Sequence, residues 1–143
     1  MSKKPTVLCI DDQLPNLHIR IMLLEQFGCE AIGVEDHLSA LRAVSQNPVD
    51  LVIIDYHLAH GQTGEAIARD IRVMHPDLPL IMLTGDSAIP ESAAAIVDAV
   101  LIKGYSNPKT LLDLIAKLIP DAELRPRRDM LVSGKNSPAT NKN

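Results

Sequence analysis

Aromatic residues are scarce in this sequence, which has no tryptophan, one phenylalanine and two tyrosines among its 143 residues. An interior with so few rings must be filled by aliphatic side chains, and we expect no surface that stacks the bases of single-stranded nucleic acid on rings. The formal net charge of −4 points the same way, because phosphate backbones are bound by dense Lys and Arg surfaces. We therefore expect no direct contact with nucleic acid.

Paired cysteine motifs and long apolar runs are also missing. Cys9 and Cys29 form no CxxC pair, and Cys9 lies inside an apolar run, so we interpret both as free thiols in a reducing compartment. No apolar run could cross a bilayer, and the opening MSKKPT leads into only four apolar residues, too few for a secretory signal. The sequence therefore predicts a soluble, cytoplasmic protein with one core and no membrane contact.

Short apolar runs alternate with segments of helical spacing along the chain. Four runs, at 7–10, 51–54, 80–83 and 99–102, are continuous, which is typical of strands buried on both faces. A weaker run at 30–34 has the character of an edge strand. Helical segments are predicted from Leu17 to Gly28, from the cap Asp36 to Asn47, from Gly64 to Pro76, over 91–97, and from the cap Asn107 to Pro120. This alternation predicts an α/β fold with a parallel sheet, right-handed crossovers and helices on both faces.

Each continuous run leads into a specific polar side chain. These residues are Asp11 and Asp12, Asp55, Thr84 and Lys103. Ligands of parallel sheets bind at the carboxyl ends of the strands, so we expect these side chains to converge. Two carboxylates about 4 Å apart repel by about 4 kcal/mol at an effective dielectric of about 20, and the site therefore requires positive charge. Lys103 supplies one cation, and the oxygen donors favour Mg²⁺ as a second.

Such a set of groups suits phosphoryl transfer. One carboxylate could attack phosphorus while the other two hold the metal, and Thr84 and Lys103 could bind the phosphoryl oxygens. Positioning and charge neutralisation are most of what this reaction requires.

The five strand-end residues, in this order, resemble the receiver domain of two-component response regulators. The resemblance covers roughly residues 5–119 and includes DYHL from Asp55 and LTGDS around Thr84. It implies a flavodoxin-like (βα)5 fold, a doubly wound parallel five-stranded sheet in the order 2-1-3-4-5. It also implies a receiver domain over 1–120 followed by a flexible polar tail over 121–143.

The resemblance implies a phosphoacceptor signalling domain, which phosphorylates and dephosphorylates only itself, in place of a general enzyme. Asp55 would accept a phosphoryl group from a histidine kinase or a histidine phosphotransfer protein, and Thr84 and Lys103 would bind that group and transmit the change. The implied Mg²⁺ ligands are Asp12, Asp55 and the backbone carbonyl of His57, with Asp11 acting mainly through water. No output domain is predicted after residue 120, so we expect a stand-alone regulator that docks to an unidentified downstream protein, and a homodimer is left open.

Several positions depart from the family pattern. Leu101 replaces the usual Phe or Tyr two residues before the lysine, although Tyr105 offers a ring nearby, and Gly104 replaces a proline. The span from Thr84 to Lys103 is short, which predicts that the fourth helix or its exit turn is trimmed. In the family, the positions of His57 and Asp86 line the route of attacking water.

Three other functions are compatible with part of this set of residues. Phosphatases of the haloacid-dehalogenase type also use a strand-end Asp and Mg²⁺, but they place a second acid two residues after the nucleophile, where His57 stands. A transition-metal site of Asp55, His57 and His60 is a weaker alternative, since no cysteine joins it. A degenerate receiver that acts only as an interaction surface is disfavoured by the complete set of strand-end residues.

Overall fold

The computed structural model describes residues 4–85, 88–103 and 108–120. All five strands are parallel and form one sheet in the order β2-β1-β3-β4-β5. The strands are β1 (Thr6–Ile10), β2 (Glu30–Val34), β3 (Leu51–Asp55), β4 (Leu80–Thr84) and β5 (Ala99–Ile102). The helices are α1 (Leu14–Gln26), α2 (His37–Gln46), α3 (Gly64–Met74), α4 (Glu91–Ala94) and α5 (Pro108–Leu118), with a short 3₁₀ turn, η1 (Ala59–Gly61). The α/β fold and the strand order 2-1-3-4-5 expected from the sequence are confirmed.

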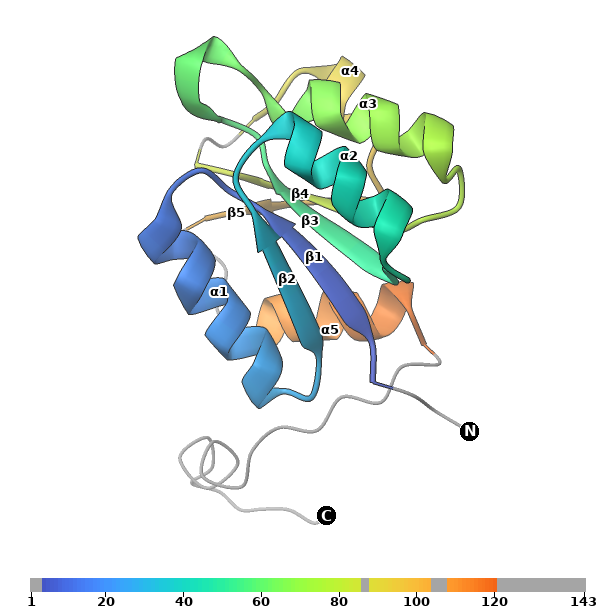
Figure 1. The fold of residues 1–143 in the computed structure, drawn as a ribbon. Helices are drawn as coiled ribbons and strands as arrows, with labels where there is room; N and C mark the ends of the chain where they lie inside the picture. Colours follow the sequence, from blue (N-terminus) through green and yellow to red (C-terminus); the bar gives the residue numbers. More distant parts are fainter. Residues whose placement is uncertain (1–3, 86–87, 104–107, 121–143) are drawn as a thin grey trace.

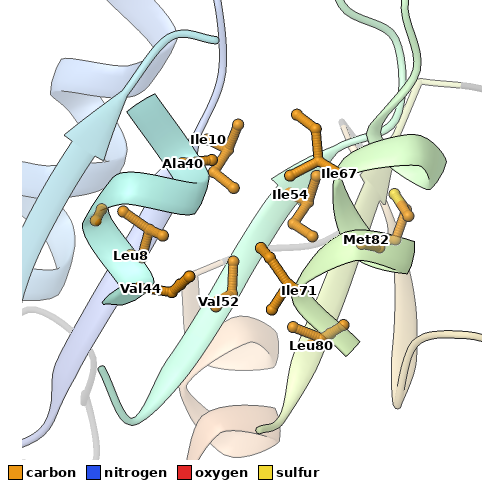
Figure 2. Close-up of a cluster of buried hydrophobic side chains, with 12 residues drawn as sticks. Leu8, Ile10, Ala40, Val44, Val52, Ile54, Ile67, Ile71, Leu80 and Met82 are labelled. Atoms are coloured by element: carbon orange, nitrogen blue, oxygen red, sulfur yellow. The ribbon is translucent and has the colours of Figure 1, made fainter. Parts of the chain in front are cut away.

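The sheet is covered on both faces (Figure 1), with α1 and α5 on one side and α2 and α3 on the other. Successive residues of a strand point to opposite faces. In β1, Leu8 and Ile10 therefore belong to the cluster under α2 and α3, which Figure 2 shows, whereas Val7 and Cys9 belong to the cluster under α1 and α5. This double burial explains why the central strands appear in the sequence as continuous apolar runs. β2, at one edge of the sheet, is largely half-exposed, as its weaker run predicted.

Both cysteines are buried and free, as expected. Burial raises the pKa of the Cys9 thiol to about 12 and that of Cys29 to about 11. Thiols in this state are poor nucleophiles, because the thiolate is the reactive form. We therefore assign both cysteines to packing.

Helix ends follow the expected signals where the structure describes them. The Asp36 carboxylate accepts a hydrogen bond from the Ser39 N–H at 2.8 Å and caps α2. Gly28, just beyond α1, has φ 92°, the left-handed conformation that glycine adopts most readily after a helix. Pro108 begins α5, and the predicted cap Asn107 lies outside the described residues.

The fourth helix is shorter than the 91–97 predicted from its alanine content. It ends at Ala94, because the following residues are bound elsewhere. The Arg72 guanidinium donates to the Ile96 carbonyl from Nε at 3.1 Å and from Nη2 at 2.7 Å, and the Asp98 N–H donates to the Leu80 carbonyl at 2.8 Å. These bonds direct the chain into β5, and the trimmed helix agrees with the short span between β4 and Lys103.

Among the residues that the structure covers, none of the helices combines the length and the apolar character that crossing a bilayer requires. The division of the chain into a domain over 1–120 and a tail over 121–143 stays a prediction, since the tail lies outside the described ranges.

Candidate functional site

Buried polar side chains gather at the carboxyl edge of the sheet. In the described part of the chain, Asp11, Asp55 and Thr84 are the three polar or charged residues that are buried, with exposures of 0%, 4% and 0%. Asp11 directly follows β1, and Asp55 and Thr84 are the last residues of β3 and β4. Because these strands are parallel neighbours with Ile10 opposite Ile54 and Asp55 opposite Leu83, their final side chains meet at one edge. Burying three polar groups together is unfavourable unless they have partners or ligands.

Three carboxylates meet at this edge. Asp11, Asp12 and Asp55 each offer an oxygen, and these oxygens all lie within 4.8 Å of one another. Asp12 is half-buried, whereas the other two are buried. A buried set of oxygen donors suits a hard divalent cation such as Mg²⁺. It is also the one group of this kind among the described residues, so the alternative site of Asp55, His57 and His60 is not formed there.

Lys103 brings a positive charge into the acidic group from the end of β5. Its Nζ lies 2.9 Å from Asp55 Oδ1 and 4.0 Å from Asp11 Oδ2. The Lys103 N–H also donates to the Thr84 carbonyl at 2.7 Å, which extends the β4–β5 ladder by one residue. The lysine is thus held by backbone pairing at the point where its side chain reaches both acids.

Arg20 is a site residue that was not predicted from the sequence. Its Nη1 lies 3.2 Å from Asp11 Oδ2, and its side chain is only 12% exposed. Asp11 Oδ1 accepts the backbone N–H of Gln13 at 2.9 Å, so each oxygen of Asp11 has a partner within the protein. A single arginine in a helix is normally interpreted as solvated, and the only available signal was its position in the apolar stripe between Leu17 and Leu24.

The charge state of Asp55 reflects opposing effects. Burial raises the pKa of its carboxyl above the ordinary value near 3.8, and the hydrogen bond and charge of Lys103 oppose that rise. The carboxylate of Asp11 adds to the rise, because two like charges disfavour each other. The ionised form of Asp55 is therefore disfavoured by its surroundings, and an additional cation would stabilise it.

The loop after Asp55 is fixed by backbone hydrogen bonds. The Tyr56 N–H donates to the Leu83 carbonyl and the Gly64 N–H to the Tyr56 carbonyl, both at 2.7 Å. His57 is exposed, pairs with Thr63 in an isolated bridge, and its ring meets that of Tyr56 edge to face at 4.8 Å between centroids. The structure therefore holds the segment that follows the central carboxylate in one place beside the acids.

Leu101 occupies the position, two residues before Lys103, where the family resemblance led us to expect an aromatic ring. It lies in β5 opposite Leu83, and it packs against the cluster under α1 and α5. Asp86, Gly104 and Tyr105 lie outside the described residues. Within the described part, the position two residues before the lysine is thus filled by a partly buried aliphatic side chain.

A doubly wound sheet in this order, with an acidic triad, a threonine and a lysine at its carboxyl edge, defines the receiver class of signalling domains. The comparison with protein families agrees, since the model of the response regulator receiver domain matches residues 7–116. The chain therefore belongs to the response regulator receiver domain family, whose members are phosphoacceptor signalling modules of two-component systems and not enzymes in the usual sense.

Curated relatives include larger proteins. The chain is 33% identical over 100 residues to the sensor protein GacS of Pseudomonas syringae pv. syringae, which is 66% of this chain but 11% of that protein. It is 28% identical over 127 residues to the photosynthetic apparatus regulatory protein RegA of Rhodovulum sulfidophilum, 88% of this chain and 68% of RegA. The chain thus spans about a tenth of the length of the sensor proteins that it matches.

Solved structures show the same architecture. The response regulator TrrA of Thermotoga maritima, in complex with Mg²⁺–BeF, is 26% identical with a TM-score of 0.73, and the match covers 80% of this chain and 98% of TrrA. A response regulator receiver domain protein of Clostridium thermocellum is 26% identical with a TM-score of 0.74, over 81% of this chain and 94% of that one.

Proposed function

We propose that this receiver accepts a phosphoryl group on Asp55 in a Mg²⁺-dependent reaction. One observation carries the proposal: the buried Asp55 carboxylate lies 2.9 Å from Lys103 and shares an acidic group with Asp11 and Asp12. The similarity to TrrA, which forms a complex with Mg²⁺–BeF, supports the same chemistry for this chain. Asp55 is the acceptor because it lies centrally, between the Asp11–Asp12 pair after β1 and Thr84 at the end of β4.

The donor is a phosphohistidine of a histidine kinase or of a histidine phosphotransfer protein. A carboxylate oxygen of Asp55 attacks phosphorus, and the new P–O bond forms as the P–N bond breaks. The electron pair of the P–N bond leaves with the imidazole nitrogen, and the product is an aspartyl phosphate. Because the attacking group must be ionised, the cation of Lys103 beside Asp55 has a direct role in keeping it so.

The residues present fit a magnesium ion. Asp12, Asp55 and the backbone carbonyl of His57 would hold it, with Asp11 contributing mainly through water. The contacts of Asp11 support this division, since Gln13 and Arg20 already bind its two oxygens, whereas Asp12 is more exposed. When bound, the ion neutralises charge on the phosphoryl oxygens during transfer.

Thr84 and Lys103 would bind the phosphoryl group once it is attached to Asp55. Phosphorylation adds about two negative charges and three acceptor oxygens, and the Thr84 hydroxyl and the Lys103 ammonium are the strand-end groups suited to bind them. Leu101 carries no ring, so we propose that the signal passes from Thr84 and Lys103 into β5 and the short α4 without an aromatic rotation at position 101. The downstream partner, the stand-alone organisation and a homodimer stay predictions.

Phosphoryl transfer from a small donor tests the proposal. The protein is incubated with acetyl phosphate, with and without Mg²⁺, and intact mass is followed for the wild type and for Asp55→Asn. We expect Mg²⁺-dependent addition of one phosphoryl group to the wild type and none to the variant. Asp113→Asn, which changes an exposed acid in α5 paired with Lys109, is the matched control and should be modified like the wild type.

Two results would contradict the proposal. Equal modification of Asp55→Asn and the wild type would place the acceptor elsewhere. Multiple turnover on free phosphomonoesters would favour the phosphatase alternative, in which Asp55 is a transient nucleophile.

A further inference from the structure

Arg20 has no part in the phosphoryl transfer described above, yet its charge is held against the acidic triad. The described site contains three carboxylates and two cations, and the second cation comes from α1. Its Nη1 lies 3.2 Å from Asp11 Oδ2, the same oxygen that Lys103 approaches to 4.0 Å. The Asp11 carboxylate is fully buried and the Arg20 side chain nearly so.

The fold explains why a residue two turns into the helix reaches the site. α1 begins four residues after β1 ends, so its N-terminus lies at the carboxyl edge of the sheet. Side chains on a helix tilt toward its N-terminus. Arg20 lies on the stripe of Leu17 and Leu24, which are buried against the sheet, and a long side chain there extends back toward Asp11.

A buried guanidinium needs an anionic partner, because desolvating an unpaired charge is strongly unfavourable. An arginine side chain carries a permanent positive charge. Its cation is therefore a permanent part of the pocket, whereas a metal ion exchanges with the solvent. The Arg20 guanidinium and a bound metal ion would both interact with the same carboxylates. Like charges a few ångströms apart in a partly buried site repel each other.

We propose that Arg20 sets the Mg²⁺ affinity of this receiver by acting as a resident counter-charge to Asp11. It stabilises the metal-free pocket and thereby weakens Mg²⁺ binding. The inference rests on the proposed function in one respect, that Mg²⁺ binds at the acidic triad. It adds a positioning residue on α1 whose removal tightens metal binding.

Isothermal titration calorimetry with MgCl₂ tests this inference without any phosphoryl donor. We expect Arg20→Gln to bind Mg²⁺ about tenfold more tightly than the wild type, because a nearby positive charge is lost. Arg20→Lys keeps the charge and should stay within about twofold. Arg69→Gln removes an exposed arginine of α3 that pairs with Glu65, and should match the wild type.

A second measurement covers the case in which Arg20→Gln is too unstable to titrate. Arg20→Met retains an unbranched apolar stem between Leu17 and Leu24, and the rise in Tm on adding Mg²⁺ is compared with that of the wild type. Both neutral variants should have a lower Tm without metal and a larger rise with it. Unchanged or weaker Mg²⁺ binding in the neutral variants, or an equal rise in Tm, overturns the inference.

The two proposals fail in different ways. The Arg20→Gln effect on the dissociation constant should persist when combined with Asp55→Asn, since Asp11 and Asp12 remain. A wild type that takes no phosphoryl group from acetyl phosphate refutes the phosphoacceptor role and leaves this result standing. Mg²⁺ binding that is undetectable in every variant overturns the present inference, whatever the outcome of the phosphorylation test.

Discussion

Gly64 packs so closely on the backbone of Asp55 that a Cβ atom at position 64 would overlap the Asp55 carbonyl oxygen. The same atom would lie 2.6 Å from Cγ2 of Ile54. The first turn of α3 therefore touches the end of β3 directly behind the Asp55 carboxylate. Any side chain larger than hydrogen at position 64 must push the helix or the strand away.

Gly64→Ala should accordingly lower the free energy of unfolding by about 2 kcal/mol, the usual effect of forcing an extra carbon into a packed site. Urea denaturation measures the change. Because the strand end must shift, we also expect slower phosphorylation of Asp55 by acetyl phosphate, measured by intact mass.

Gly85→Ala is the matched control for this substitution. A Cβ at Gly85 would meet nothing within 4 Å, so its stability should stay within about 0.5 kcal/mol of the wild type. Equal losses in both variants would show that the contact at Gly64 is not the cause.

The strand-end residues could be predicted because their signals are local. A buried strand on both faces appears as an unbroken apolar run, and the first polar side chain after it marks the carboxyl edge of the sheet. Asp55, Thr84 and Lys103 were found in this way, and the structure places Asp55 and Lys103 in direct contact. The convergence follows from parallel pairing, which the alternation of strands and helices indicates.

Arg20 and Arg72 could not be predicted from the sequence, because their partners are set by packing. A lone arginine in a helix is usually solvated, and even a position in an apolar stripe, as for Arg20, does not identify the partner of the side chain. The length of α4 was misjudged for the same reason: alanine content favours a helix over 91–97, but the hydrogen bonds from Arg72 to Ile96 override that propensity. Sequence patterns thus do not predict the long-range contacts of single polar side chains.

Arg72 joins three segments of the chain through its guanidinium. It donates to the carbonyl oxygens of Pro76, Leu78 and Ile96 and to the carboxylate of Asp98. Arg72→Met leaves these acceptors without their donor, and we expect it to lower the free energy of unfolding by about 3 kcal/mol. Urea denaturation measures the loss, and hydrogen exchange should show reduced protection in α4 and β5.

The control for Arg72 lies one turn earlier in the same helix. Arg69 makes an exposed pair with Glu65, and pairs of this kind contribute little, so Arg69→Met should cost no more than about 0.5 kcal/mol. A similar decrease in the free energy of unfolding of both variants would show that the effect comes from removing a positive charge from α3 and not from the hydrogen bonds of Arg72.

The cap of α2 gives a prediction with a defined pH dependence. Hydrogen bonds from Ser39 lower the pKa of Asp36 below its ordinary value of 3.8, and the bond from the Ser39 backbone N–H has the largest effect. Asp36→Ala should reduce the free energy of unfolding by about 1 kcal/mol at neutral pH, and Asp36→Ser should retain most of the stability. Because the pKa of Asp36 is lower in the folded state than in the unfolded state, its carboxylate stabilises the fold at pH values above the unfolded pKa. The stability difference between the wild type and Asp36→Ala should therefore disappear as the pH falls through the folded pKa of Asp36.

Ionisation of Asp55 should affect folding stability with the opposite sign to that of Asp36. Its folded pKa is raised above 3.8, chiefly by burial, so the folded state binds a proton more readily than the unfolded chain does. Ionisation of Asp55 therefore destabilises the metal-free fold, and this penalty is complete above the folded pKa and absent below the unfolded one. Asp55→Asn should therefore raise the free energy of unfolding at pH 7 without Mg²⁺, and its Tm should lie above that of the wild type.

Thermal unfolding of the wild type and Asp55→Asn across pH, in the presence of a chelator, separates this effect from other titrations. The difference between the two proteins should be largest at neutral pH and shrink as the pH falls through the folded pKa toward 3.8. Mg²⁺ should reverse the order at neutral pH, because the ion binds the ionised carboxylate and stabilises the folded state in proportion to its occupancy. A variant less stable than the wild type in the chelator would show that the Lys103 contact outweighs burial. The Asp55 carboxylate would then already be stabilised by Lys103 in the metal-free protein, and the driving force for metal binding would have to come from Asp11 and Asp12.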